Sequence, residues 1–316
     1  MMKTISMRIL LGLCLALSAC HTDTSTHTQK KTSPKTRLSF LPFKGIRYHE
    51  VKRRFSNGLS FDSLGFQQEP SWIIQFESND SILAYSPEKK RMLGFHLLHD
   101  HGNVYNFAKE WFRIKSISKD SVLMQRLQVN KREIANDIRS DVNLTFYAEN
   151  YIRNILKTNA EVLQRPTSRD TAFIQKRSQT ANAHPNNRDS VFAARQPVQL
   201  IPKSKLVSVE RLSSVDVLNG KTEAYDYLYP SYRVIMHKAY KDFGYTFTVL
   251  VDDKGKMSLG TFSGEIPEYH EVRKKVLEGI ISVYLQNLFT VKPGTTLGIA
   301  HASEVTVTIK GIKDKQ

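Results

Sequence analysis

Short apolar runs alternate with turn-forming residues between residues 72 and 129, and this pattern constrains the fold more than any other feature of the chain. The runs are 72–76, 82–85, 92–98, 111–117 and 122–129. Asn, Asp, Gly, Ser, Pro and charged residues separate them, and these residue types favour tight turns. Runs of this length with short connections are typical of an antiparallel meander. We therefore predict a β-rich domain over residues 38–157, built as a small open barrel or curved sheet.

The apolar period changes near the end of this domain. Ile134, Ile138, Val142, Phe146 and Ile152 recur at approximately helical spacing. Such a stripe more often faces a core than a membrane or a partner protein. We expect a helix here that closes the domain, and an amphipathic helix that binds a membrane or a partner is the alternative.

Three histidines and an aspartate form the cluster in this domain with metal-ligand chemistry. His96, His99, Asp100 and His101 could in principle gather around zinc or copper. However, His99 and His101 fall at an expected hairpin tip, where polar residues are ordinary. We therefore predict no metal site, no catalytic residue and no cofactor. A metal-dependent enzyme built on these histidines is the alternative.

Residues 158–205 are rich in Pro, Asn, Gln, Ser, Thr and Arg, and hold few large apolar side chains. A segment of this composition buries too little apolar surface to offset the entropy lost on ordering. We predict a largely disordered basic linker between two domains.

The last third of the chain predicts a small α+β domain over residues 206–316. Residues 245–251 alternate as a strand, 252–255 supply a tight turn with glycine, and 256–262 return as a hairpin. Apolar residues then recur at helical intervals from 272 to 284, and residues 304–309 alternate as a final strand. The whole chain is therefore expected to be α+β.

This order of hairpin, helix and final strand resembles the TonB C-terminal domain. The matching segments are Asp252-Asp253-Lys254-Gly255-Lys256, Phe289-Thr290-Val291-Lys292-Pro293-Gly294, Gly298, and Ser303-Glu304-Val305-Thr306-Val307. Two features depart from that family. Tyr229-Pro230 lies farther from the first strand than the family's Tyr-Pro pair, and Phe289 stands in place of a tryptophan.

The resemblance implies a site for an extended peptide that adds as a strand beside the final strand. That edge would consist of Glu304, Val305, Thr306, Val307, Thr308 and Ile309. Val305, Val307 and Ile309 would then pack inward, and Thr306 and Thr308 would face outward. The alternative is that this strand only completes the domain's own sheet.

The first twenty residues have the pattern of an export signal. Lys3 and Arg8 precede the apolar run Ile9–Leu17, which is shorter than the roughly 20 residues that a membrane-spanning helix needs. The sequence Leu17-Ser18-Ala19-Cys20 resembles the lipobox of bacterial lipoproteins. The resemblance implies a signal peptide at 1–19, lipidation of Cys20, a flexible tether at 20–37, and a position on the periplasmic face of the outer membrane.

Charge and cysteine content fit an exported, anchored chain. The 46 Lys and Arg residues exceed the 30 Asp and Glu residues by 16, and loss of Lys3 and Arg8 with the leader lowers the excess to 14. Cys14 lies within the leader, so the mature chain keeps only Cys20 and has no disulfide pair. Because the chain is expected to be exported, we predict no nucleic-acid partner despite its basic charge.

Together these features predict a non-enzymatic envelope lipoprotein that acts as a protein-interaction or scaffolding module. Its expected partners are the membrane, through the lipid, and an outer-membrane transporter or another envelope protein. A true TonB carries an inner-membrane helix, which the lipid anchor would replace here, so a binding role is expected rather than force transmission. A peptidoglycan-binding structural lipoprotein is a further alternative.

Overall fold

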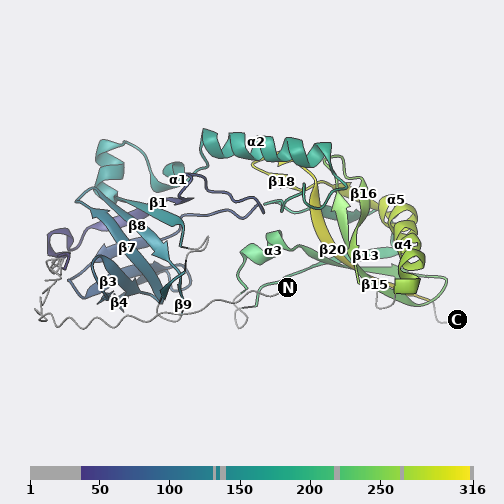
Figure 1. Cartoon of the computed structure of the whole chain (residues 1–316), viewed down its shortest axis with the longest axis horizontal. Helices are drawn as coiled ribbons and strands as arrows, with labels where there is room; N and C mark the ends of the chain where they lie inside the picture. The colour runs from purple at the N-terminus through teal and green to yellow at the C-terminus, as the bar shows by residue number, and fades with distance from the viewer. Residues whose placement is uncertain (1–36, 131–132, 136–139, 217–220, 264–266, 314–316) are drawn as a thin grey trace, which may run out of the picture. The chain divides into compact units, whose positions relative to one another are not determined.

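The computed structural model describes residues 37–130, 133–135, 140–216, 221–263 and 267–313 (Figure 1). The expected signal peptide, Cys20 and nearly all of the expected tether lie outside the described residues. From Arg37 onward the chain forms one compact unit. Its described part holds a nine-stranded sheet, a five-stranded sheet and three two-stranded pairs. The class is α+β, as predicted.

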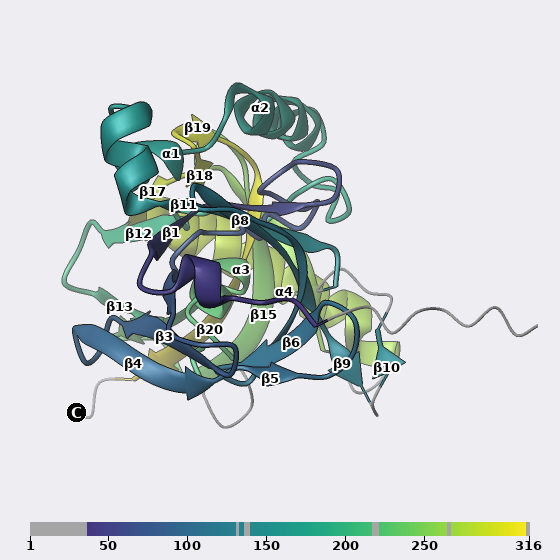
Figure 2. The same cartoon turned by 90° about the vertical axis from the view of Figure 1, so that its left-hand side faces the viewer.

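The first sheet is an antiparallel meander that nearly closes on itself. Its strands, in the order in which they pair, are β4 (Arg91–His96), β3 (Ser81–Ser86), β2 (Ile73–Phe76), β1 (Arg47–Phe55), β11 (Val142–Ala148), β8 (Ser121–Leu127), β7 (Glu110–Ile117), β6 (Val104–Phe107) and β5 (Leu98–His99). Only Leu97 separates β4 from β5, although these strands end the pairing order. The sheet therefore curls into a barrel-like shape, with β4 and β5 across from β1 and β11 in Figure 2.

Aromatic side chains fill the interior of this sheet. Phe40 stacks on Phe76 with 4.5 Å between ring centroids, and Phe107 stacks on Phe112 at 4.6 Å. All four rings are at most 1% exposed. Burying a large apolar side chain stabilises a fold by about 1.5 to 3 kcal/mol. The interior is thus a packed core rather than an empty ligand cavity.

The second sheet has a mixed topology. Its strands, in pairing order, are β13 (Val207–Leu212), β14 (Ser231–His237), β20 (Ser303–Ile312), β15 (Phe243–Val251) and β16 (Met257–Phe262). Strand β14 runs parallel to β20, and the other neighbours are antiparallel. The predicted hairpin and the predicted final strand are both present.

One helical segment covers one face of this sheet. It consists of α4 (His270–Gly279), the π-helical turn η4 (Ile280–Leu285) and α5 (Gln286–Leu288). Leu277, Ile281 and Leu285 are at most 3% exposed and belong to the same core cluster as the valines of β20. Figure 1 shows α4 and α5 beside β15 and β16. The predicted helix therefore forms where the apolar period placed it.

Apart from one helix of 16 residues, the remaining elements are short. The paired strands are β9 (Val129–Asn130) with β10 (Glu133–Ile134), β12 (Gln199–Pro202) with β17 (Phe289–Lys292), and β18 (Thr295–Thr296) with β19 (Ile299–Ala300). The other helices are η1 (Leu41–Phe43), η2 (Tyr151–Ile155), α1 (Ala160–Leu163), α2 (Ser168–Ala183), α3 (Ala224–Leu228) and η3 (Pro267–Tyr269). Among the described residues, none of these helices combines the length and apolarity that crossing a bilayer requires.

Two predictions about the middle of the chain are wrong. In the described part of 134–155, strand β11, whose residues are alternately buried and half-buried, takes the place of the closing helix, and the helical residues are Glu149, Asn150 and those of η2. The expected disordered linker over 158–205 contains α1, α2 and β12. Helix α2 carries few apolar residues, but Ile174 and Ala181 are fully buried in a cluster with Phe61, Phe192 and Ala302. A small apolar stripe and a strong helix cap therefore order a segment whose composition is polar.

Candidate functional site

The predicted peptide-binding strand is not an edge. Glu304, Val305, Thr306, Val307, Thr308 and Ile309 lie in β20, which pairs with β15 on one side and β14 on the other. The prediction of an exposed edge is therefore wrong. The physical reason is that residues 231–237, which the sequence analysis did not assign to a strand, fill the position beside β20 and satisfy its main-chain groups.

The side chains of β20 point to the faces of the sheet that were predicted. Val305, Val307 and Ile309 are at most 2% exposed and pack under the helical segment. Thr306 and Thr308 are half-buried on the opposite face of the sheet. The Oγ1 atom of Thr308 lies 3.1 Å from that of Thr246 on β15.

The candidate metal-binding histidines do not converge. His96 is exposed on β4, the Nε2 atom of His99 lies 3.0 Å from the carbonyl oxygen of Gly102, and the Nδ1 atom of His101 lies 2.6 Å from a carboxylate oxygen of Asp100. Within the described ranges, no three His, Cys, Asp or Glu side chains are grouped so that they could hold a metal ion. The geometry therefore gives no support to an enzyme built on this cluster.

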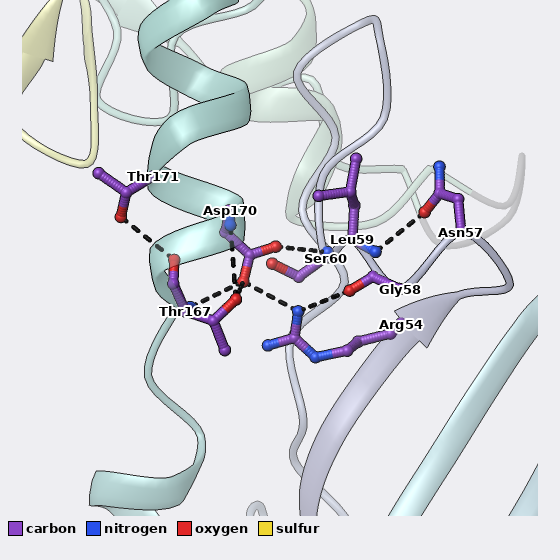
Figure 3. Close-up of polar contacts among 8 residues, drawn as sticks. All are labelled: Arg54, Asn57, Gly58, Leu59, Ser60, Thr167, Asp170 and Thr171. Carbon is purple, nitrogen blue, oxygen red and sulfur yellow. Dashed lines mark hydrogen bonds and ion pairs between the residues drawn. The ribbon is translucent and has the colours of Figure 1, made fainter.

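The buried carboxylate of Asp170 accepts four hydrogen bonds (Figure 3). One carboxylate oxygen accepts the peptide N–H of Ser60 at 2.8 Å. The other accepts from Nη1 of Arg54 at 2.9 Å and from the backbone N–H and hydroxyl of Thr167, each at 2.7 Å. Burial by itself would raise the pKa of Asp170, but these hydrogen bonds lower it to about 2.

The Asp170 cluster is structural. The carboxylate is fully buried and both of its oxygens are used, so no open position is left for a substrate. Thr167 and Asp170 form a capping box at the start of α2, and Arg54 connects that helix end to β1. The Thr-x-x-Asp spacing is the sequence signal for this helix start, and it lies within the segment predicted to be a disordered linker.

A second buried polar residue, His301, is also fully enclosed. Its ring stacks on Phe192 with 3.7 Å between centroids. The Nδ1 atom lies 3.0 Å from the carbonyl oxygen of Ala302, and Nε2 lies 2.9 Å from the hydroxyl of Thr296. This network fits a neutral ring with the proton on Nδ1. Burial lowers the pKa of His301 to about 4, so the ring is neutral at neutral pH.

One open groove lies beside an unpaired strand edge. It runs between residues 195–200 and strand β13, and its volume is about 740 Å³. The residues that matter for its chemistry are Arg195, Val198, Leu200, Val209, Arg211 and Tyr232. Strand β13 ends the pairing order of the five-stranded sheet, and β12 pairs only with β17 among the described strands. Two strand edges therefore face the same groove.

The register of β13 shows which of its main-chain groups point into the groove. The N–H of His237 donates to the carbonyl oxygen of Leu206 at 2.8 Å, so these residues form a hydrogen-bonded pair. Bonded pairs recur at every second residue of an antiparallel ladder. The N–H and C=O groups of Val209 and Arg211 consequently point away from β14. Within the described part of the chain these groups have no hydrogen-bond partner.

The same reasoning applies to the other side of the groove. The N–H of Lys203 donates to the carbonyl oxygen of Leu288 at 2.8 Å. Lys203 and every second residue before it in β12 therefore direct their main-chain N–H and C=O groups toward β17. The N–H and C=O groups of Leu200 therefore point toward the groove. The hydroxyl of Tyr232, on β14, donates to the carbonyl oxygen of Val198. This bond connects the five-stranded sheet to the 195–200 side of the groove.

The groove is positively charged. Arg195 and Arg211 line it, and no Asp or Glu is among its lining residues. Arg195 lies 4.5 Å over the ring of Tyr227 and pairs with Glu69 at 2.9 Å, and Arg211 donates to the carbonyl oxygen of Asp226 at 2.8 Å. Each guanidinium has five N–H donors, so both retain donors for a bound acidic group.

A smaller cavity of about 500 Å³ lies where Glu304 and Thr306 meet Arg177 and Arg188. Arg188 and Glu304 form an ion pair at 3.0 Å that neutralises both charges. The groove beside β13 combines unpaired main-chain groups with two arginines that keep free N–H donors, so it is the better candidate site.

No protein-family model matches this chain, and no curated protein matches it. Function is therefore inferred from the residues of this chain alone.

Proposed function

We propose that this chain is a non-enzymatic, lipid-anchored protein of the bacterial cell envelope that binds another envelope protein by strand addition. The guest would be an extended, acidic peptide segment that lies in the groove and pairs with the outer edge of β13. The observation that carries the proposal is the set of unpaired N–H and C=O groups of Val209 and Arg211, which face a groove lined by arginines.

The leader supports the proposed location. Lys3, Arg8, the apolar run and Leu17-Ser18-Ala19-Cys20 together have the form of a lipoprotein signal. A lipid at Cys20 and the tether behind it would hold the folded part near the periplasmic face of the outer membrane. Outer-membrane transporters and other envelope proteins would then be the accessible partners.

The likeness of the second domain to the TonB C-terminal domain supports strand addition as the mode of binding, but at a different edge. The hairpin β15–β16, the helical segment and β20 follow the order of that family. In this chain β14 occupies the place beside β20 that a guest strand would take. The strand that would accept the guest peptide is therefore not β20 but β13, which lies two strands away at the edge of the sheet.

Val209→Pro is expected to weaken peptide binding by about tenfold or more. Proline removes an N–H that points into the groove and leaves the bonds between β13 and β14 in place. The probe is a fluorescein-labelled synthetic peptide of seven residues that alternates Val and Glu, and the measurement is fluorescence anisotropy. The matched peptide carries Lys in place of Glu and is expected to bind at least tenfold more weakly, because Arg195 and Arg211 repel it.

Hydrogen exchange on the same complex tests the location. In the free protein the amides of Val209 and Arg211 are expected to exchange rapidly and that of Glu210 slowly, because only the last donates within the sheet. The acidic peptide is expected to slow exchange at Val209 and Arg211. Equal affinity for the acidic and basic peptides, or unchanged exchange at both amides, would contradict the proposed groove.

Cys20→Ala is expected to move the protein from the membrane fraction to the soluble fraction. The variant cannot be acylated at this position, so the contribution of about 0.8 kcal/mol per buried methylene is lost. The measurement is cell fractionation with labelled palmitate, and Ser25→Ala in the tether is the control. A C20A protein that stays in the membrane fraction after a high-salt wash would rule out lipid anchoring at this residue.

A further inference from the structure

Three large apolar side chains are exposed together at one end of the five-stranded sheet. Tyr240 is 93% exposed, Ile312 47% and Leu206 44%. They come, respectively, from the loop between β14 and β15, from the last residue of β20 and from the residue before β13. A single exposed apolar side chain is ordinary, but a group of them within polar surroundings marks a contact surface.

Main-chain hydrogen bonds hold these three segments side by side. The N–H of His237 donates to the carbonyl oxygen of Leu206 at 2.8 Å. The N–H of Ala239 donates to the carbonyl oxygen of Ile312 at 3.0 Å. The loop 238–242 thus crosses the end of β20, because β14 and β15 lie on either side of that strand. The three apolar side chains therefore belong to one surface, although they are far apart in the sequence.

Four exposed lysines from the same three segments surround the apolar side chains, and they are Lys205, Lys238, Lys241 and Lys313. We call these lysines and the three apolar residues the end patch. The one acidic residue of the segments 205–206, 238–242 and 312–313 is Asp242, whose carboxylate accepts the backbone N–H of Lys313 at 2.7 Å.

The helical segment nearest this end of the sheet does not reverse the charge. Arg273 lies 5.9 Å over the ring of Tyr245, near the start of β15. Residues 267–275 hold two Glu residues against three Arg and Lys residues. The surroundings of the end patch are therefore positively charged.

We propose that the end patch is a docking surface for an anionic lipid bilayer. Tyr240, Ile312 and Leu206 enter the headgroup region, and the four lysines lie at the level of the lipid phosphates. Tyrosine suits this depth because its ring is apolar and its hydroxyl is polar. Lysine suits it because its stem lies along apolar surface while the ammonium group stays in water. Each lysine is attracted by the negative potential of the anionic lipids.

The composition and shape of the end patch favour a lipid surface over a protein or a small ligand. Protein interfaces are enriched in arginine and depleted in lysine, whereas the end patch holds four lysines and no arginine. Small ligands bind in concave sites, and neither of the two cavities described above includes a residue of the end patch. Side chains exposed at a loop and at strand ends instead fit a broad surface.

Co-sedimentation with vesicles tests the end patch. The protein is the mature chain with Cys20→Ala, so that no acyl chain contributes. It is expected to bind vesicles that contain phosphatidylglycerol at least tenfold more tightly than vesicles of phosphatidylcholine alone. The double variant K241Q/K313Q is expected to bind the anionic vesicles about 25-fold more weakly, since each lysine contributes about fivefold. The matched control K89Q/K176Q removes two exposed lysines elsewhere and is expected to leave binding unchanged.

The aromatic residue is tested separately. Tyr240→Ser is expected to weaken binding to the anionic vesicles by about tenfold, because the ring leaves the interface. Tyr229→Ser is the matched control, since Tyr229 is 59% exposed and lies at the opposite end of β14, and it is expected to leave binding unchanged. The fluorescence of Y240W is expected to shift to shorter wavelength on these vesicles, and that of Y229W is not.

Three results would each overturn the proposal. They are equal binding or no binding to the two kinds of vesicle, a Y240S protein that binds as Y229S does, and a K241Q/K313Q protein that matches K89Q/K176Q. Docking through the end patch depends neither on the groove beside β13 nor on acylation of Cys20. Its failure would therefore leave the proposed function in place.

Discussion

Replacing Asp170 with alanine is expected to lower the free energy of unfolding by about 3 to 5 kcal/mol. The substitution leaves the guanidinium of Arg54, whose side chain is only 16% exposed, without its carboxylate. It also removes the acceptor for the N–H of Ser60 and half of the capping box at Thr167 (Figure 3). The measurement is urea denaturation followed by circular dichroism at pH 7.

Two further variants make this prediction specific. Asp120→Ala removes an exposed aspartate from a turn and is expected to change stability by less than about 0.5 kcal/mol. The double variant R54M/D170A is expected to be more stable than D170A, because the uncompensated buried charge is removed with its partner. A loss below about 1 kcal/mol in D170A would show that the buried ion pair contributes little.

The protein is expected to lose about 3 kcal/mol of stability through His301 as the pH falls from 6.5 to 4. The pKa of this histidine is about 4 in the folded state, because burial disfavours the charged ring, and the ordinary value is 6.5. Between these two values the unfolded chain binds a proton that the folded chain does not. Stability therefore falls as pH falls through this window, and it is fully present above pH 6.5.

His301→Gln removes this titration and keeps a side chain that can hydrogen-bond to Thr296. Its stability is expected to be lower at pH 7 and to depend less on pH between 6.5 and 4 than that of the wild type. His184→Gln, at an exposed position, is the control and is expected to keep the wild-type slope. The same slope in H301Q and the wild type would contradict the prediction. The titration of Asp170 is distinct, since its folded pKa of about 2 places the loss of stability below pH 3.8.

Local alternation and turn residues predicted the first four apolar runs and the C-terminal hairpin. Strands β2, β3, β4 and β7 lie at the positions of those four runs. Turns such as Asp252–Gly255 depend on a few adjacent residues, and Gly255 indeed has a positive φ of 82°. The groove could not be found in this way. Its two sides come from residues 195–200, which have the composition of a linker, and from β13, whose alternation of Val207 and Val209 is short.

Local periodicity by itself placed the hairpin β15–β16, strand β20 and the segment that covers the second sheet, because side-chain alternation and turn chemistry act between near neighbours, but it assigned neither β11 nor β14 to a strand. Only the tertiary structure decided that β20 is central. Its parallel partner β14 lies about 70 residues earlier in the chain, and pairing at that separation leaves no periodic mark in either strand. The tertiary structure likewise decided which edge stays unpaired, since an edge is defined by what lies beside a strand and not by the residues within it.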